Sequence, residues 1–240
     1  MRTAVIVQAR TGSTRLPGKV MMPLAGHTVL EEVLCRCRTI PGIDVVVCAI
    51  PEGPRDDALI ALAEGSGAVV VRGSESDVLD RYAKAAETVG ANIVMRITSD
   101  CPLIDPEICG AVLRLRASEA ADYASNVLEP SYPKGLDCEA FTATALAEAA
   151  ARASEVSDRE HVTPWLIRAP HLKRVNLLSG NPRLARMRWT LDYPEDLAFV
   201  RAVFAALPTG SPSGMPDVLA VLERQPSIAA INAARTVRQV

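Results

Sequence analysis

The sequence has neither a strong charge of one sign nor a long apolar run. Its 26 lysines and arginines nearly balance 28 aspartates and glutamates, and the net charge is −2. Such a balance creates no overall field to attract nucleic acid or an anionic membrane, so an anionic ligand must be held by a local group of cations. No stretch approaches the ~20 apolar residues of a membrane span. The N-terminal apolar run is too short for the core of a signal peptide.

Paired cysteines are absent too. The six cysteines are scattered, and the closest two, Cys35 and Cys37, lack the second pair that a zinc site needs. Reduced thiols in a cytoplasmic protein fit this pattern better than disulfides or metal ligands do. We find no internal repeat and no linker, and 240 residues with 49% hydrophobic content can bury one large core. The sequence therefore predicts one cytoplasmic domain over residues 1–240.

Apolar, β-branched segments alternate with segments of helical periodicity up to residue 105. The predicted strands are 4–7, 45–49, 68–71 and 92–97, and the predicted helices are 29–38, 55–64 and 78–88. Strands that are apolar on both faces and alternate with helices form a parallel sheet covered on both sides. We therefore predict an α/β fold of the Rossmann-like, doubly wound type with a mostly parallel sheet and right-handed crossovers.

The pattern changes after residue 105. Helices are predicted at 106–117 and 143–153, and strands at 136–141, 172–178 and 187–191. A helix is predicted near Ser157, where Ser-Asp-Arg-Glu is typical of an N-terminal cap. Another is predicted from Pro194, since proline suits the first turn and the acids that follow favour the positive end of the helix dipole.

The segment after the first predicted strand is rich in cations, glycines and hydroxyls. It reads Gln8-Ala-Arg-Thr-Gly-Ser-Thr-Arg-Leu-Pro-Gly-Lys19. Ligands of open parallel sheets bind at the carboxyl ends of the strands, and backbone N–H groups, hydroxyls, Arg and Lys bind anions. A polyphosphate-binding loop is thus favoured over a solvated basic loop. It is not a Walker A motif, because five residues separate Gly12 from Gly18-Lys19 and Val20 follows. The third glycine of a dinucleotide fingerprint is missing as well.

Two aspartates follow predicted strands and are candidate metal ligands. Asp100 ends the segment Ile97-Thr-Ser-Asp100, and Asp192 ends Trp189-Thr-Leu-Asp192. If both strands are parallel to the first, both carboxylates lie at the same sheet edge and could share one Mg²⁺. Asp192 could instead be a helix N-cap, and Asp100 a turn residue.

The loop and later motifs resemble a known family. The run from Arg10 to Lys19 resembles the N-terminal signature of the cytidylyltransferases that activate 3-deoxy-manno-octulosonate and neuraminic-type acids. Further segments are similar to the branch typified by the spore coat polysaccharide biosynthesis protein F: Asp80-Arg-Tyr82, Arg96-Ile-Thr-Ser-Asp-Cys-Pro-Leu-Ile-Asp105, Gly135-Leu-Asp-Cys-Glu139, Glu160-His-Val-Thr-Pro164 and Asp192-Tyr-Pro-Glu-Asp-Leu197. The likeness spans nearly the whole chain.

The resemblance implies a Mg²⁺-dependent enzyme that transfers CMP from CTP to a small acidic sugar. Asp100 and Asp192 would bind Mg²⁺, and Arg15, Lys19 and Asp100 would be catalytic. The implied nucleotide contacts are Gln8, Ala9, Arg10, Thr11, Gly12, Ser13, Arg15, Lys19, Ser76, Asp80, Arg81 and Thr98. The implied acceptor contacts are Lys134, Asp137, Glu139 and His161. Thr98-Ser99 stands where the octulosonate enzymes have Gln-Gly, which leaves the identity of the acceptor open.

The resemblance also implies a division of the chain and an assembly. Residues 1–105 would be the nucleotide-binding half. Residues 106–240 would form the acceptor-binding and dimerisation half, with a small inserted segment at the interface of a homodimer. In the implied reaction a sugar hydroxyl attacks the α-phosphate in line and pyrophosphate leaves, so positioning and charge neutralisation supply most of the acceleration.

Other functions stay open at this point. A sugar-1-phosphate nucleotidyltransferase that uses UTP or dTTP would share the sheet and the loop. A non-catalytic nucleotide-binding module would keep the loop but would not need Asp192. A glycosyltransferase is less consistent with the sequence, because no Asp-x-Asp pair follows a predicted strand.

Overall fold

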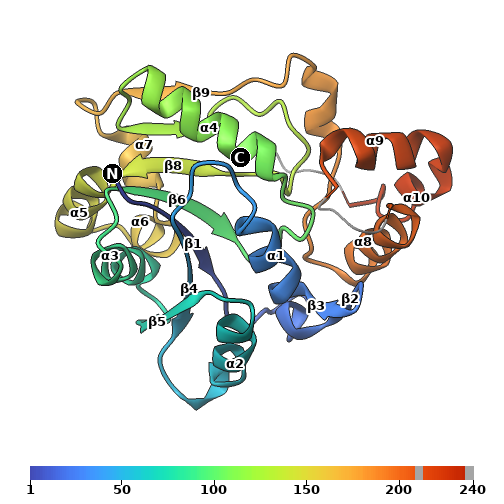
Figure 1. Ribbon diagram of the computed structural model, residues 1–240, viewed down its shortest axis with the longest axis horizontal. Helices are drawn as coiled ribbons and strands as arrows, with labels where there is room; N and C mark the ends of the chain where they lie inside the picture. The colour runs from blue at the N-terminus through green and yellow to red at the C-terminus, as the bar shows by residue number, and fades with distance from the viewer. Residues whose placement is uncertain (209–212, 236–240) are drawn as a thin grey trace.

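A seven-stranded sheet forms the centre of the molecule (Figure 1). The structure, a computed structural model, describes residues 1–208 and 213–235. The sheet has the order β5-β4-β1-β6-β8-β7-β9. Its strands are β1 (Thr3–Gln8), β4 (Val45–Pro51), β5 (Val69–Gly73), β6 (Ile93–Thr98), β7 (Tyr123–Ser125), β8 (Glu139–Thr142) and β9 (Arg174–Asn176). β1 pairs in parallel with β4 and β6, β4 with β5, and β7 with β9, whereas β8 runs antiparallel to β6 and β7.

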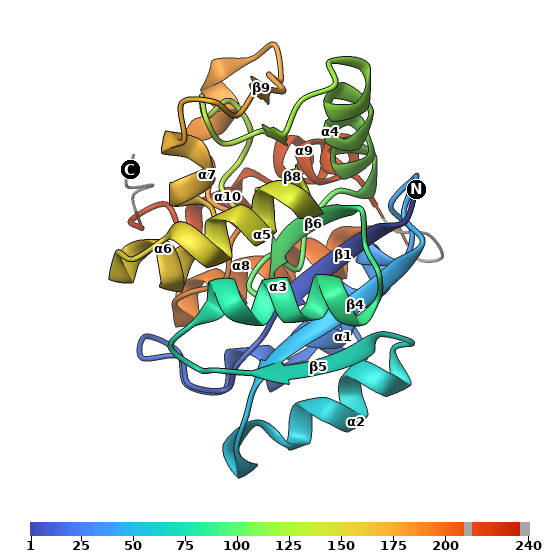
Figure 2. The same ribbon diagram turned by 90° about the vertical axis from the view of Figure 1, so that its left-hand side faces the viewer.

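Helices cover both faces of this sheet. One face carries α1 (Val29–Cys37), α2 (Ala58–Gly65) and α4 (Pro106–Ser118), and the other carries α3 (Val78–Thr88), α5 (Ala143–Arg152) and α7 (Pro164–Arg168). The helices α8 (Pro194–Ala206), α9 (Met215–Arg224) and α10 (Pro226–Ala230) pack on one another to one side of the sheet (Figure 1) and contribute to the core of the first face. α6 (Val156–His161) packs on α3 and α7. Figure 2 shows α3 and α5 crossing the face nearest the viewer. The predicted doubly wound, mostly parallel α/β fold is confirmed.

The two cores follow from the alternation of side chains along each buried strand. In β1, Val5 and Val7 belong to the core under α1 and α8, while Ala4 and Ile6 belong to the core under α3 and α5. All four are fully buried. Because successive side chains of a strand point to opposite faces, an apolar residue at every position is what a sheet covered on both sides requires.

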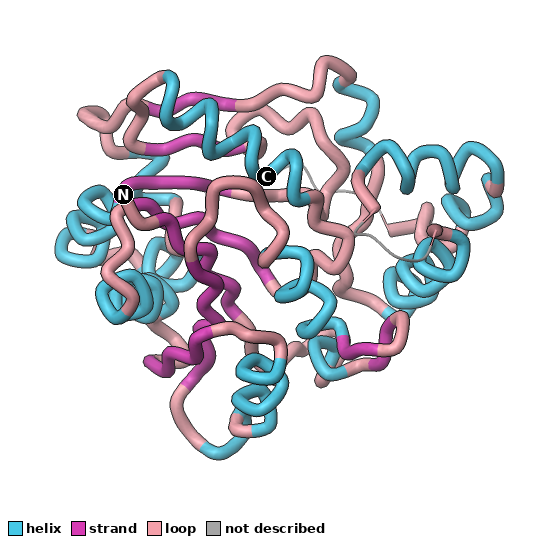
Figure 3. The backbone as a smooth tube through the Cα atoms, viewed as in Figure 1, coloured by secondary structure: helices cyan, strands magenta, loops and turns pink. Residues whose placement is uncertain are grey.

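Short elements connect the main layers, and Figure 3 shows how loops join the strands to the helices. They are the 3₁₀ helices η1 (Lys19–Met21), η2 (Pro54–Asp56) and η3 (Pro182–Arg186), and the hairpin of β2 (Pro23–Leu24) with β3 (His27–Thr28). None of the helices in residues 1–208 and 213–235 combines the length and apolarity needed to cross a lipid bilayer.

Two local predictions were wrong. Residues 187–191 do not form a strand. They are extended, but their backbone bonds go to two different loops: Trp189 donates to the carbonyl of Lys134, and Leu191 donates to that of Asp100. Ser157 does not cap α6, because the helix already begins at Val156 after Glu155, which makes no side-chain cap bond. β7, α9 and α10 were not predicted.

Candidate active site

The loop after β1 is held in place by hydrogen bonds to a buried carboxylate. Asp56, in η2, accepts hydrogen bonds from the backbone N–H and the hydroxyl of Thr11, at 2.6 and 2.8 Å. Within the loop, the N–H groups of Ser13 and Gly18 both donate to the carbonyl of Thr11. Next to Thr11, the Arg55 guanidinium lies over Gly12, 2.5 Å from the position of an added Cβ. The contacts of Thr11 with Asp56 therefore hold the loop in place.

Lys19 ends this loop and enters the buried floor of the site. Its Nζ donates to Oδ2 of Asp100 at 2.9 Å, to Oδ1 of Asp192 at 2.9 Å and to the carbonyl of Leu191 at 2.7 Å. Burial disfavours the ammonium, but the two carboxylates outweigh it and raise the pKa of Lys19. Lys19 is therefore a charged ammonium that joins the ends of two distant segments.

Asp100 follows β6 as predicted. Its Oδ1 accepts a hydrogen bond from the Thr98 hydroxyl at 2.6 Å, and its Oδ2 accepts from Lys19. Burial would raise the pKa of Asp100, yet the Lys19 charge and the hydrogen bonds of Thr98 and Lys19 hold it below its usual value. The carboxylate is thus ionised and ready to bind a cation.

Asp192 reaches the same place from the other half of the chain. Its Oδ1 accepts from Arg15 Nη2 at 2.6 Å as well as from Lys19, and its Oδ2 accepts from Arg188 Nη2 at 3.1 Å. It is not the N-cap of α8, because Tyr193 holds that position. Since Lys19 contacts both aspartates, they lie together as predicted, although only Asp100 follows a strand.

A cavity of about 360 Å³ opens above these groups. The predicted nucleotide contacts Gln8, Ala9, Arg10, Ser13, Arg15, Lys19, Arg81 and Thr98 line it, together with Asp100 and His161. Three buried atoms of its lining residues have no hydrogen-bond partner among the described residues: Gln8 Oε1, Arg81 Nε and Arg96 Nε. Since buried polar atoms are nearly always paired, the cavity suits a polar guest.

Some predicted residues lie outside the lining. Ser76 and Asp80 are exposed at the start of α3. The other predicted residues that do not line the cavity are Thr11, Gly12, Lys134, Asp137, Glu139 and the predicted metal ligand Asp192. The sequence interpretation missed Thr14, Val20, Val78, Arg96, Ser99 and Glu160, which do line the cavity. Arg96 had a usable signal, because a charged residue inside the apolar strand β6 needs a partner.

The partner of Arg96 is Glu139. Arg96 forms an ion pair with the Glu139 carboxylate, which also accepts a hydrogen bond from Tyr123 Oη at 2.6 Å. The side chain of Glu139 is 7% exposed. Glu139, which was predicted to contact the acceptor, is thus part of a buried ion pair that holds Arg96 in the lining of the cavity.

The other predicted acceptor contacts are Lys134, Asp137 and His161, of which the first two form an ion pair and the third lines the cavity. Lys134 Nζ lies 2.7 Å from Oδ2 of Asp137, and burial raises the pKa of Asp137 in spite of this partner. His161 lies at the end of α6, which packs on α3 and α7, and it lines the cavity. Of the four predicted acceptor contacts, His161 alone lines the cavity, and the roles of all four stay predictions.

The donor set suits a hard divalent cation that is shared with a ligand. Among the described residues, no group of three or more His, Cys, Asp or Glu side chains is placed to hold a metal ion. Asp100 and Asp192 are two carboxylates that both contact Nζ of Lys19. Mg²⁺ at nucleotide sites uses one or two carboxylates and takes its other ligands from phosphates and water, so the pair fits that ion.

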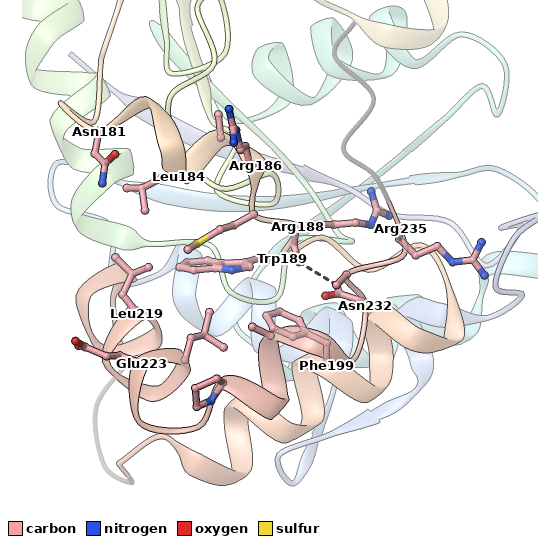
Figure 4. Close-up of a pocket in the computed structure, with 16 residues that line it drawn as sticks. Asn181, Leu184, Arg186, Arg188, Trp189, Phe199, Leu219, Glu223, Asn232 and Arg235 are labelled. Carbon is pink, nitrogen blue, oxygen red and sulfur yellow. Dashed lines mark hydrogen bonds between the residues drawn. The ribbon is translucent and has the colours of Figure 1, made fainter.

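A second cavity of about 930 Å³ lies between η3 and the helices α8, α9 and α10. Figure 4 shows Trp189, Phe199 and Leu219 facing it, with Arg188, Asn232 and Arg235 along one side. None of the residues predicted for the nucleotide or the acceptor lines this cavity. It shares Arg188 with the network around Asp192.

Comparison with known proteins identifies the family of this chain. A family model described as cytidylyltransferase matches residues 4–199. The chain is 32% identical to the spore coat polysaccharide biosynthesis protein SpsF of Bacillus subtilis, over 93% of this chain and 95% of that protein. It is 33% identical to a 3-deoxy-manno-octulosonate cytidylyltransferase of Anaeromyxobacter, over 87% of this chain and 78% of that one.

A solved structure extends the likeness to the whole fold. A cytidylyltransferase from Leptospira borgpetersenii superposes with a TM-score of 0.91 at 28% identity, and the match covers 100% of both chains. The family model covers the loop after β1 as well as Asp100 and Asp192. The chain belongs to the cytidylyltransferase family.

Proposed function

We propose that this enzyme transfers CMP from CTP to a sugar acid or a related acidic acceptor and releases pyrophosphate. The observation that carries the proposal is the contact of Lys19 with both Asp100 and Asp192 on the floor of a cavity lined by Arg10 and Arg15. Cations and carboxylates in one place suit a polyphosphate with a divalent metal ion. The octulosonate enzyme among the relatives supports CTP as the donor and a sugar acid as the acceptor.

The chain's own residues would divide the work. Arg10, Arg15 and Ser13 would bind the triphosphate, and Asp100 and Asp192 would hold Mg²⁺. When bound, this ion supplies a Lewis acid at the α-phosphate. With Asp100 and Asp192 engaged by the ion, the Lys19 ammonium would be released from them and would turn to the phosphates. There it would stabilise the charge that develops on pyrophosphate.

The acceptor would approach from the half of the chain after residue 105. His161 lines the cavity, and Lys134 with Asp137 lies close enough to Asp100 for the charges to interact. A homodimer that buries part of this half, and residues 1–240 as one nucleotidyltransferase domain, belong to the same proposal.

Calorimetric titration with CTP, UTP, dTTP and GTP, each with Mg²⁺, tests the choice of nucleotide. CTP should bind most tightly. Arg10→Met should weaken CTP binding about tenfold, since a charge-assisted contact is lost, whereas Arg183→Met should not, because Arg183 is exposed and lines neither cavity. Tighter binding of UTP would reject CTP as the donor, and no binding of any nucleotide would reject the reaction class.

A further inference from the structure

The Asp192 carboxylate is oriented by a second buried carboxylate. Asp196, in the first turn of α8, is 0% exposed and accepts five hydrogen bonds. Two come from Arg188, at 3.0 and 2.9 Å, and two from the backbone N–H groups of Asp192 and Tyr193, at 2.9 and 3.0 Å. The same Nη2 of Arg188 also donates to Oδ2 of Asp192. Asp196 therefore holds the backbone N–H of Asp192 in place. It also holds the guanidinium of Arg188, which donates to Oδ2 of Asp192.

The fifth hydrogen bond comes from the C-terminal part of the chain. Asn232, just after α10, is 5% exposed, and its Nδ2 lies 3.0 Å from the carbonyl oxygen of Arg188 (Figure 4). The same Nδ2 lies 3.0 Å from Oδ1 of Asp196. Asn232 thus contacts the carboxylate of Asp196 and the backbone of the arginine that pairs with it. The family model ends at residue 199, so this contact comes from a segment outside the matched region.

The ring of Tyr193 makes a second connection between the C-terminal segment and the nucleotide loop. The guanidinium of Arg235 lies 4.1 Å from the ring centroid, Arg15 lies at 5.4 Å and Arg188 at 5.6 Å. Arg235 also pairs with Glu195 at 2.8 Å. The same aromatic ring therefore contacts a cation of the loop after β1 and a cation near the C-terminus.

We propose that Asn232 is a positioning residue for the metal site. Through Asp196 and Arg188 it holds the Asp192 carboxylate in the orientation in which that group binds the divalent cation of the nucleotide complex. The C-terminal segment is thereby part of the active site. This inference rests on the proposed function, because it concerns the metal that accompanies the nucleotide.

The direct test measures metal binding apart from turnover. Free Mn²⁺ is counted by electron paramagnetic resonance in the presence of saturating CTP, for the wild type, Asn232→Ala and Asn181→Ala. Asn181 is the matched control, since it lines the same cavity but its side chain bonds only the N–H of Arg183. Loss of a group behind a metal ligand typically weakens metal affinity 10–100-fold. The dissociation constant of Mn²⁺ should rise about tenfold in Asn232→Ala and stay unchanged in Asn181→Ala.

Two further measurements separate positioning from a structural role. CTP binding without metal and the midpoint of thermal unfolding should both stay close to the wild-type values in Asn232→Ala. If Asn232→Ala does not fold, Asn232→Asp keeps the size of the side chain, removes the amide donor and should weaken Mn²⁺ binding at least as much. Unchanged Mn²⁺ affinity in the folded variants overturns the inference, as does an equal loss of metal-free CTP binding. A wild type that binds no Mn²⁺ with CTP overturns the proposed function as well.

Discussion

The Nζ of Lys19 lies 2.9 Å from Oδ1 of Asp192, although 173 positions separate the two residues. The side chains are only 11% and 12% exposed, so the pair is shielded from much of the solvent. Arg15 and Arg188 contact the same carboxylate. Three cations thus surround the Asp192 carboxylate, and the proposed polyphosphate and metal ion would rearrange these charges on binding.

Lys19→Met should lower turnover more than nucleotide affinity. The substitution keeps most of the apolar stem and removes the charge that would stabilise the leaving pyrophosphate, so we expect turnover to fall at least ~10²-fold. The KM for nucleotide should change much less, because the contact is stronger in the transition state than in the ground state. Steady-state kinetics of pyrophosphate release measure both. Full turnover with a proportionally raised KM would show that Lys19 only anchors the triphosphate.

Asp100→Asn and Asp192→Asn should each abolish turnover while the protein stays folded. Both amides keep the shape of the side chain but lose the charge that holds a divalent cation. Pyrophosphate release at saturating Mg²⁺ is the measurement, with the circular dichroism spectrum as the control for folding. Normal turnover in one variant and none in the other would mean that the two aspartates do not share one ion.

Gly135→Ala should destabilise the protein strongly. Gly135 has φ of +112°, and an added Cβ would lie 2.5 Å from the backbone nitrogen of Thr190. Steric overlap and backbone strain together cost roughly 2–5 kcal/mol of unfolding free energy. Gly180→Ala is the matched control, since Gly180 has φ of +74° with open space around its Cβ position. Chemical denaturation should show a loss of only ~1–2 kcal/mol there. Equal losses would mean that the close approach at Thr190 is unimportant.

Glu31→Gln should remove an acid-sensitive contribution at the start of α1. Glu31 and Thr28 form a capping box, and the hydrogen bonds from Thr28 lower the pKa of Glu31 below 4.5. A carboxylate with a lowered pKa contributes stability that is present above its unfolded-state value and is lost as the pH falls through the folded-state value. The wild type should be more stable than the variant at pH 7, by at most ~0.5 kcal/mol because the site is largely accessible to solvent. This difference should be lost as the pH falls through the folded-state pKa of Glu31. If the difference in unfolding free energy between the wild type and Glu31→Gln stays constant at every pH, it comes from the shape of the side chain and not from its charge.

The sequence pattern was sufficient where burial alone decides structure. β1, β4, β5 and β6 lie within two residues of their predicted bounds, because apolar residues such as Val5 and Ile6 fit only a strand buried on both faces. α3 spans the predicted residues 78–88. Lys19, at the end of the loop after β1, lies beside Asp100, and Arg10 and Arg15 line the same cavity.

Features that depend on distant partners escaped prediction. Residues 187–191 alternate like a strand, but Trp189 and Leu191 bond to separate loops. Glu139 was assigned to the acceptor on resemblance, and nothing local indicates its pair with Arg96. Asn232 lies 44 positions from Arg188, whose carbonyl it contacts. Such partners become visible only when the fold brings their segments together.

Release of pyrophosphate tests the central claim most directly. The enzyme is incubated with Mg²⁺ and CTP, UTP, dTTP or GTP, each with a panel of sugar acids that includes 3-deoxy-manno-octulosonate and a neuraminic acid, and with sugar 1-phosphates. The account predicts pyrophosphate release and a CMP-linked product with CTP and at least one acidic sugar, and none with Lys19→Met above about 1% of the wild-type rate. Release that occurs only with a sugar 1-phosphate and UTP or dTTP would contradict it.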